Sequence, residues 1–132
     1  MIYQLDSKLF KIIFFKYFFY FNIFIISLLS LYPGNLIGLI FFGDDSTFPG
    51  SDKMHHFFSY FILSIIGSIA YFEKKFFYRL FIFLVSLGFF LELLQIWIPN
   101  RYFEFLDMFS NFFGVLVGIN IVRFFKKYYD KI

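Results

Sequence analysis

Three ionisable residues lie inside long apolar stretches of this sequence: His56, Glu92 and Asp107. A histidine beside carboxylates can act as a general acid or base near neutral pH. The same nitrogen and oxygen atoms also suit zinc or a harder divalent ion. Two basic residues, Lys53 and Arg101, precede them closely in the sequence and could together bind a phosphate group. The residue types therefore allow acid–base, metal or anion chemistry.

Spacing along the chain places more polar and small residues on the same helical faces. Glu92 and Gln95 are three residues apart and Asp107 and Asn111 four, so each pair shares one face of a helix. Glycines continue these faces and would allow close helix approach in lipid. The candidate binding residues are Asp52, Lys53, His56, Tyr60, Glu92, Gln95, Arg101, Asp107 and Asn111. The candidate helix-packing glycines are Gly67, Gly88, Gly114 and Gly118.

The composition indicates the kind of element that must position these residues. Of the 132 residues, 61% are hydrophobic and only 16% are charged, and the mean hydropathy is +0.76. Soluble domains carry roughly 25% charged residues, so the expected solvent is lipid. The chain has no cysteine, which excludes disulfides and thiolate chemistry.

Four apolar runs are long enough to cross a bilayer, which takes about 20 residues. They cover residues 12–32, 54–72, 80–98 and 104–125. Breaks at Pro33-Gly34, Pro49-Gly50 and Pro99-Asn100 separate them. The sequence predicts an all-α integral membrane protein, in which residues 1–132 form a single domain with four transmembrane helices in a compact bundle.

Basic residues predict the orientation of these helices, because cytoplasmic loops are enriched in lysine and arginine. Only Lys53 and Arg101 lie on one side of the predicted bundle. Both termini are therefore expected in the cytoplasm, and the net charge of +3 needs no nucleic-acid partner. The other ten basic residues lie on the side of the termini: Lys8, Lys11, Lys16, Lys74, Lys75, Arg79, Arg123, Lys126, Lys127 and Lys131.

The three ionisable residues are expected at a similar depth below the outer surface. At ~1.5 Å per helical residue, His56 lies roughly 6 Å inside the start of its helix. Glu92 lies roughly 10 Å before the end of its helix, and Asp107 roughly 9 Å beyond Arg101. We therefore expect one outward-facing polar site, with Arg101 paired to Glu92 or Asp107. His55 points about 100° away from His56 and is expected at the membrane interface.

The sequence favours binding over catalysis at this site. It contains no HExxH motif, nucleophile elbow or glycine-rich phosphate loop. The three candidate ligands would come from three different helices, so spacing does not support a metal. We expect neither a metal nor a cofactor. Simple hydrogen bonding between helices is the structural alternative for Gln95 and Asn111.

The polar positions between residues 50 and 120 also resemble a known family, the VanZ-like proteins. The matching pattern reads Asp52-Lys53-x-x-His56-Phe57-x-x-Tyr60, then Glu92-x-x-Gln95, then Arg101, then Asp107-x-x-x-Asn111-x-x-Gly114. The first predicted helix matches by topology. The family usually follows its Pro-x-Arg with small hydroxyl residues, whereas Tyr102, Phe103 and Glu104 follow here.

This resemblance implies a small multi-pass protein of the bacterial cytoplasmic membrane. The founding member of the family is associated with low-level resistance to the glycopeptide teicoplanin. The expected partners are membrane lipids and a lipid-linked envelope precursor or a lipoglycopeptide, bound at the polar site. Two alternatives stay open: an intramembrane hydrolase or transferase acting on a phosphorylated envelope lipid, and a structural membrane subunit without a ligand.

Overall fold

The described part of the chain holds four helices: α1 (Ile2–Leu31), α3 (Ser51–Ala70), α4 (Lys74–Gln95) and α5 (Phe105–Tyr129). This computed structural model describes residues 2–34, 36, 39–40, 43, 51–71 and 74–129. The expected break at Pro49-Gly50 and the basic residue Lys131 lie outside these residues. The all-helical class predicted from the sequence is confirmed.

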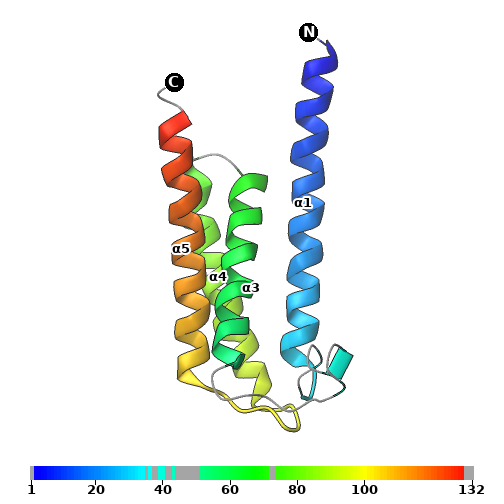
Figure 1. The fold of residues 1–132 in the computed structure, drawn as a ribbon, viewed down its shortest axis with the longest axis vertical. Coiled ribbons are helices and arrows are strands. Elements are labelled where there is room, and N and C mark those ends of the chain that lie inside the picture. The colour runs from blue at the N-terminus through cyan, green and yellow to red at the C-terminus, as the bar shows by residue number, and fades with distance from the viewer. Residues whose placement is uncertain are drawn as a thin grey trace.

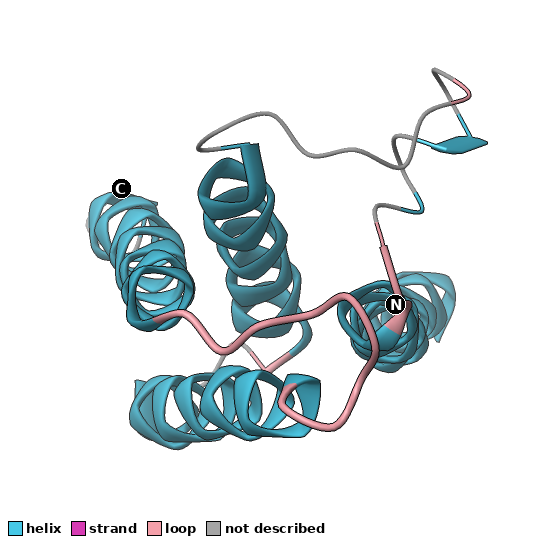
Figure 2. Cartoon of the chain, turned by 90° about the horizontal axis from the view of Figure 1, so that it is seen from below, coloured by secondary structure: helices cyan, strands magenta, loops and turns pink. Residues whose placement is uncertain are grey.

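Successive helices run in opposite directions along one bundle axis (Figure 1). The start of α1 and the end of α5 therefore lie at the same end. At the other end, which we call the loop end, α1 and α4 finish and α3 and α5 begin. Residues 96–104, which connect α4 to α5, cross the loop end and pass beside α1 (Figure 2).

Three helices are long and apolar enough to cross a membrane: Phe10–Leu31, Lys75–Gln95 and Phe105–Tyr128. Many of their large apolar side chains are exposed on the bundle surface, such as Phe14, Phe90 and Phe124. Such a surface suits contact with lipid rather than water. The helix α3 is less apolar because Lys53, His55 and His56 lie in its first two turns. It contacts all three other helices.

The helix bounds differ from the predicted apolar runs mainly at polar ends. The helix α1 begins at Ile2 rather than at residue 12, and α4 begins at Lys74 rather than at residue 80. Lysine and arginine end an apolar run but are good helix formers, so the helices continue through them. The helix α4 ends at Gln95 rather than at residue 98, where tighter i→i−3 turns lead to Pro99.

The most extensive helix contact joins α3 and α5, and two glycines of α5 make it close. A Cβ atom on Gly114 would collide with the carbonyl oxygen of Phe57, and one on Gly118 would lie 2.7 Å from that of Phe61. Only glycine at these positions lets the two backbones approach this closely. The side chain of Val115, between these two glycines in the sequence, is fully buried in the hydrophobic core.

The other two candidate packing glycines lie at different contacts. A Cβ on Gly67 would lie 2.7 Å from Cε2 of Phe19, which is a buried side chain of α1. A Cβ on Gly88 would lie 3.2 Å from Cβ of Asn111 and 3.3 Å from Cε1 of Tyr60. Gly88 thus lets α4 approach two residues of the candidate site.

Candidate functional site

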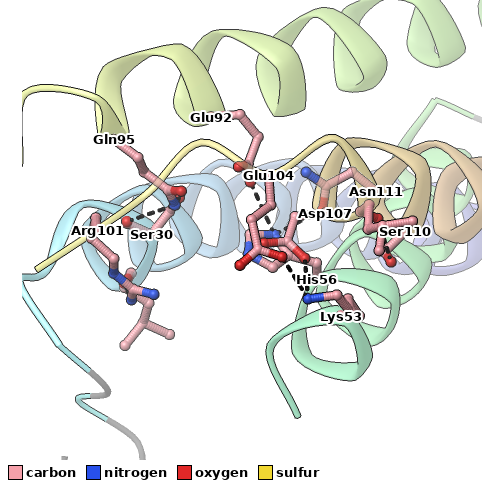
Figure 3. A network of polar contacts seen from close by, with 12 residues as sticks. Ser30, Lys53, His56, Glu92, Gln95, Arg101, Glu104, Asp107, Ser110 and Asn111 are labelled. Atoms are coloured by element: carbon pink, nitrogen blue, oxygen red, sulfur yellow. Dashed lines mark hydrogen bonds and ion pairs between the residues drawn. The ribbon is translucent and has the colours of Figure 1, made fainter. Parts of the chain in front are cut away.

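Five polar side chains from three helices meet near the loop end, and we call them the polar cluster (Figure 3). Lys53 and His56 come from α3, Glu92 from α4, and Asp107 and Asn111 from α5. Asp107 lies in the first turn of α5, where the helix dipole favours a carboxylate. The close contact between α3 and α5 brings their members together, and α4 adds Glu92 from a third side.

His56 lies at the centre of the polar cluster. Its Nδ1 is 3.1 Å from Oδ1 of Asn111 and 3.4 Å from Oε1 of Glu92. Its Nε2 is 3.9 Å from Oδ2 of Asp107. A single imidazole therefore faces two carboxylates, one beside each ring nitrogen.

Glu92 is the most unusual member, because its carboxyl group is completely buried. Neither of its oxygens has a hydrogen-bond partner among the described residues, and the same holds for Oδ1 of Asp107. A buried polar group without a partner is unfavourable, and a buried carboxylate without one is more so. The fold thus keeps acceptor atoms in its interior that it does not itself satisfy.

Lys53 covers the polar cluster on its exposed side. Its Nζ lies 2.7 Å from Oε2 of Glu104 and 3.8 Å from Oδ1 of Asp107. Lys53 precedes the apolar part of α3, and the hydrogen bond to Glu104 raises the pKa of this lysine above its ordinary value. Lys53 is therefore charged and already paired.

A small cavity of about 70 Å³ lies beside the polar cluster, between α1 and α3. Its lining includes His56, Tyr60, Asp52 and Arg101. Tyr60 is buried, and its hydroxyl has no hydrogen-bond partner within the described ranges. The cavity therefore connects the polar cluster with two further candidate residues, Asp52 and Tyr60.

Gln95 and Arg101 bond to the end of α1, which for Gln95 is the structural alternative expected from the sequence. Arg101 donates from Nε to the carbonyl oxygen of Tyr32 (3.0 Å) and from Nη2 to that of Leu29 (3.3 Å). Gln95 donates to the carbonyl oxygen (3.0 Å) and the hydroxyl (2.9 Å) of Ser30. We call these five residues the α1 cap, because they satisfy carbonyls that the end of a helix leaves free.

The expected pairing of Arg101 with Glu92 or Asp107 is wrong. It does not occur among the ion pairs of the described residues, and the guanidinium is occupied at the α1 cap instead. Carbonyl oxygens at a helix C-terminus carry partial negative charge, so they attract a cation without any acidic side chain. Figure 3 shows Arg101 and Gln95 beside Ser30, on the other side of the view from His56 and Lys53.

Two contributors escaped the sequence analysis. Glu104 partners Lys53, and its position just before the first turn of α5, three residues before Asp107, is the signal that could have shown it. Ser30 partners Gln95, but an isolated serine near a helix end gives no such signal.

The polar cluster is rich in acceptors and poor in free cations. Such a site can move protons through its histidine, bind hydroxyl or ammonium donors, or hold a metal ion. One potential ligand atom from each of His56, Glu92 and Asp107 lies within 4.8 Å of the other two.

What these residues do in the cell must be inferred from their own chemistry and geometry. Comparisons of the chain with protein-family models, with curated proteins and with solved structures found no match.

Proposed function

We propose that this chain is a VanZ-like protein of the bacterial cytoplasmic membrane, that all four helices cross the bilayer, and that both termini lie in the cytoplasm. The distribution of basic residues supports this orientation, because ten of the twelve are on the side of the termini. The loop end, with Lys53 and Arg101, then faces outward.

Of the four proposed membrane-spanning helices, α3 is the least apolar. Its position in the bundle nevertheless supports the proposal that it crosses the bilayer. Protein neighbours from all three other helices surround α3, so few of its side chains need to contact lipid. Its histidine at the centre of the polar cluster, His56, faces α4 and α5. A helix shielded in this way can carry ionisable groups that a lipid-exposed helix cannot.

We further propose that the polar cluster binds the head group of a cell-envelope lipid or of a lipoglycopeptide. The observation that carries this proposal is the buried carboxyl group of Glu92, whose oxygens accept no hydrogen bond from the described residues. A binding site built to pair with a ligand holds buried polar atoms that lack partners without it. Hydroxyl and amino groups, which sugar head groups and glycopeptides share, are donors that suit Glu92 and Asp107.

Lys53 and Arg101 already have partners within the protein, so the site suits a phosphate group less well than a hydroxyl or amino group. Lys53 is paired with Glu104, and Arg101 is occupied by the carbonyls of Leu29 and Tyr32. A phosphate would have to displace one of these partners. Donor groups would instead pair with the acceptors of Glu92 and Asp107 that have no hydrogen bond among the described residues, and neither cation would be displaced.

A second candidate function is an intramembrane hydrolase or transferase acting on a phosphorylated envelope lipid. The position of His56, 3.4 Å from one carboxylate and 3.9 Å from another, favours it. A carboxylate that orients a histidine assists general acid–base catalysis. A structural subunit without a ligand is the remaining alternative, and the fully partnered α1 cap is the part of the molecule that fits it.

The decisive experiment deletes the gene for this chain in its host and complements the deletion strain with the unmodified chain or with single variants. A deletion strain is expected to become more sensitive to teicoplanin, and the intact chain should restore resistance. Glu92→Gln and Asp107→Asn should fail to restore it at unchanged protein levels. The matched control is Asn120→Ala, an exposed amide on the same helix as Asp107 that bonds only to the carbonyl of Leu116.

Two results would count against binding at the polar cluster. Full complementation by Glu92→Gln would show that its carboxylate is not needed. Purified protein that does not distinguish vesicles containing envelope lipids from plain phosphatidylcholine vesicles, and does not bind teicoplanin, would refute the ligand class. Turnover of a phosphorylated lipid that is lost in His56→Ala would favour the enzyme.

A further inference from the structure

We propose that His56, Glu92 and Asp107 together bind one divalent metal ion. One ligand atom from each residue lies within 4.8 Å of the other two, and the residues come from α3, α4 and α5. Metal–ligand distances of ~2.0–2.2 Å for nitrogen and oxygen place bound ligand atoms about 3–3.5 Å apart. The observed 3.4 Å between His56 Nδ1 and Glu92 Oε1 lies in this range, so Nδ1 is the nitrogen that would bind the ion, and the side chain of Asp107 has to move toward it.

The state of the carboxylates gives independent support. Glu92 is fully buried, and both of its oxygens lack a hydrogen-bond partner within the described part of the chain. Asp107 is 5% exposed, and its Oδ1 also accepts no hydrogen bond there. Two carboxylates held together inside a protein repel one another unless a positive charge or a proton lies between them. A divalent cation supplies that charge and uses the free oxygens as ligands.

Lys53 and Arg101, the nearby cations of the protein, do not place a positive charge between the two carboxylates. Lys53 reaches Asp107 only at 3.8 Å and makes its shorter contact, 2.7 Å, with Glu104 outside the triad. Arg101 donates to the carbonyl of Tyr32. Among the described residues, neither of these two cations forms an ion pair with Glu92.

The surroundings of His56 suit a metal ligand as well. Oδ1 of Asn111 lies 3.1 Å from Nδ1. With Nδ1 bound to the ion, the imidazole proton lies on Nε2, which is 3.9 Å from Oδ2 of Asp107, and Oδ1 of Asn111 is a further oxygen that the ion can reach.

The donor set indicates the class of metal. One imidazole nitrogen and two carboxylate oxygens suit zinc and manganese, whereas copper(I) and iron–sulfur clusters prefer sulfur ligands. Three protein ligands leave at least one position open on the ion. An oxygen of a bound head group would fill this open position on the ion. A role of the metal in holding the head group therefore rests on the proposed function. The binding of the ion itself does not.

The test measures the binding of Zn²⁺ and Mn²⁺ to the full-length chain in lipid nanodiscs after treatment with a chelator. We expect one ion per chain by calorimetry and a higher unfolding temperature with metal. Glu92→Gln and Asp107→Asn preserve side-chain shape and should each weaken binding at least about 100-fold, because even the partners of ligands contribute 10- to 100-fold. Metal analysis of protein purified without chelator provides a second measurement, which needs no variant.

The matched control compares two adjacent histidines. His56→Ala should abolish tight binding, whereas His55→Ala, an exposed neighbour outside the triad, should leave it unchanged. Equal loss in both variants would mean that surface histidines hold the metal, and would refute the proposed site. Absence of binding by the intact chain at millimolar Zn²⁺ and Mn²⁺ would also refute it, and would leave a proton as the group between the carboxylates.

The outcomes separate this inference from the proposed function. Metal binding without any lipid or teicoplanin binding would leave the metal site and refute the ligand. Lipid or teicoplanin binding that is unchanged by chelator would support the ligand and refute a role for the metal in holding it.

Discussion

The polar cluster and the α1 cap both lie at the loop end of the bundle, and both place polar groups in a largely apolar molecule. In the α1 cap, Gln95 and Arg101 bond to Ser30, Leu29 and Tyr32 at 2.9–3.3 Å. The cap thereby satisfies the end of α1. The cap is complete within the protein.

The polar cluster is incomplete by the same measure. Glu92 is as deeply buried as Gln95, yet its oxygens have no hydrogen-bond partner among the described residues. Buried polar groups that are satisfied stabilise a fold, and those that are not reduce its stability. The difference is the one expected if the α1 cap serves the structure and the polar cluster has the ligand-binding role proposed above. Mutations should therefore affect the two regions in opposite ways.

The largest loss of stability is expected from a substitution that separates α3 from α5. Gly118→Leu would force a side chain against Ser64 and the carbonyl oxygen of Phe61 and separate α3 from α5. We expect a loss of about 3 kcal/mol or more, since the obstacle includes backbone. Little folded protein should appear in size-exclusion chromatography in detergent. Val117→Leu, on the exposed side of the same helix, should behave like the unmodified chain.

The second-largest loss of stability is expected in the α1 cap, and it should distinguish the cap from the polar cluster. Arg101→Ala leaves the carbonyls of Leu29 and Tyr32 without their donor, which should cost about 1–3 kcal/mol. A lower unfolding temperature in detergent would show it. Arg123→Ala, an exposed arginine near the other end, serves as the control. An unchanged unfolding temperature in Arg101→Ala would mean that the cap is not a structural element.

Glu92→Gln should change the stability of the protein in the opposite direction to Arg101→Ala. The neutral amide removes a buried charge and can donate to neighbouring acceptors, so stability should stay equal or rise by up to ~1 kcal/mol. Teicoplanin protection and metal binding should be lost in the same variant. A thermal melt in the absence of metal measures the first effect. A decrease in stability comparable to that of Arg101→Ala would remove the contrast between the two regions.

The smallest effect is expected at the ion pair between Lys53 and Glu104. Glu104 is 47% exposed, and exposed ion pairs contribute roughly 0–1 kcal/mol. Glu104→Gln should therefore change the unfolding temperature only slightly, and salt should reduce even that difference. Thermal melts of both proteins at low and high salt would measure it. A large, salt-independent effect would instead make Glu104 a structural part of the polar cluster.

The sequence was sufficient for the helical class and for the meeting of His56, Glu92 and Asp107 at one level of the bundle. Helical rise is nearly constant, so counting residues from a break such as Pro99 gives depth without a structure. It was not sufficient for the partners of Arg101. Those partners are backbone carbonyls of Leu29 and Tyr32, which every residue possesses and which no side-chain pattern distinguishes. Long, flexible side chains at equal depth can also turn in several directions.

The hydrogen bonds of the α1 cap have a consequence for biosynthesis. Arg101 and its acceptor on Tyr32 are 69 residues apart, so the ribosome must complete α3 and α4 before this donor exists. Until then the last carbonyls of α1 depend on water or lipid head groups for hydrogen bonds. The first helix therefore enters the membrane with an unfinished end, and the third connection of the chain completes it. A chain stopped before residue 95 should hold α1 less firmly than the full-length protein does.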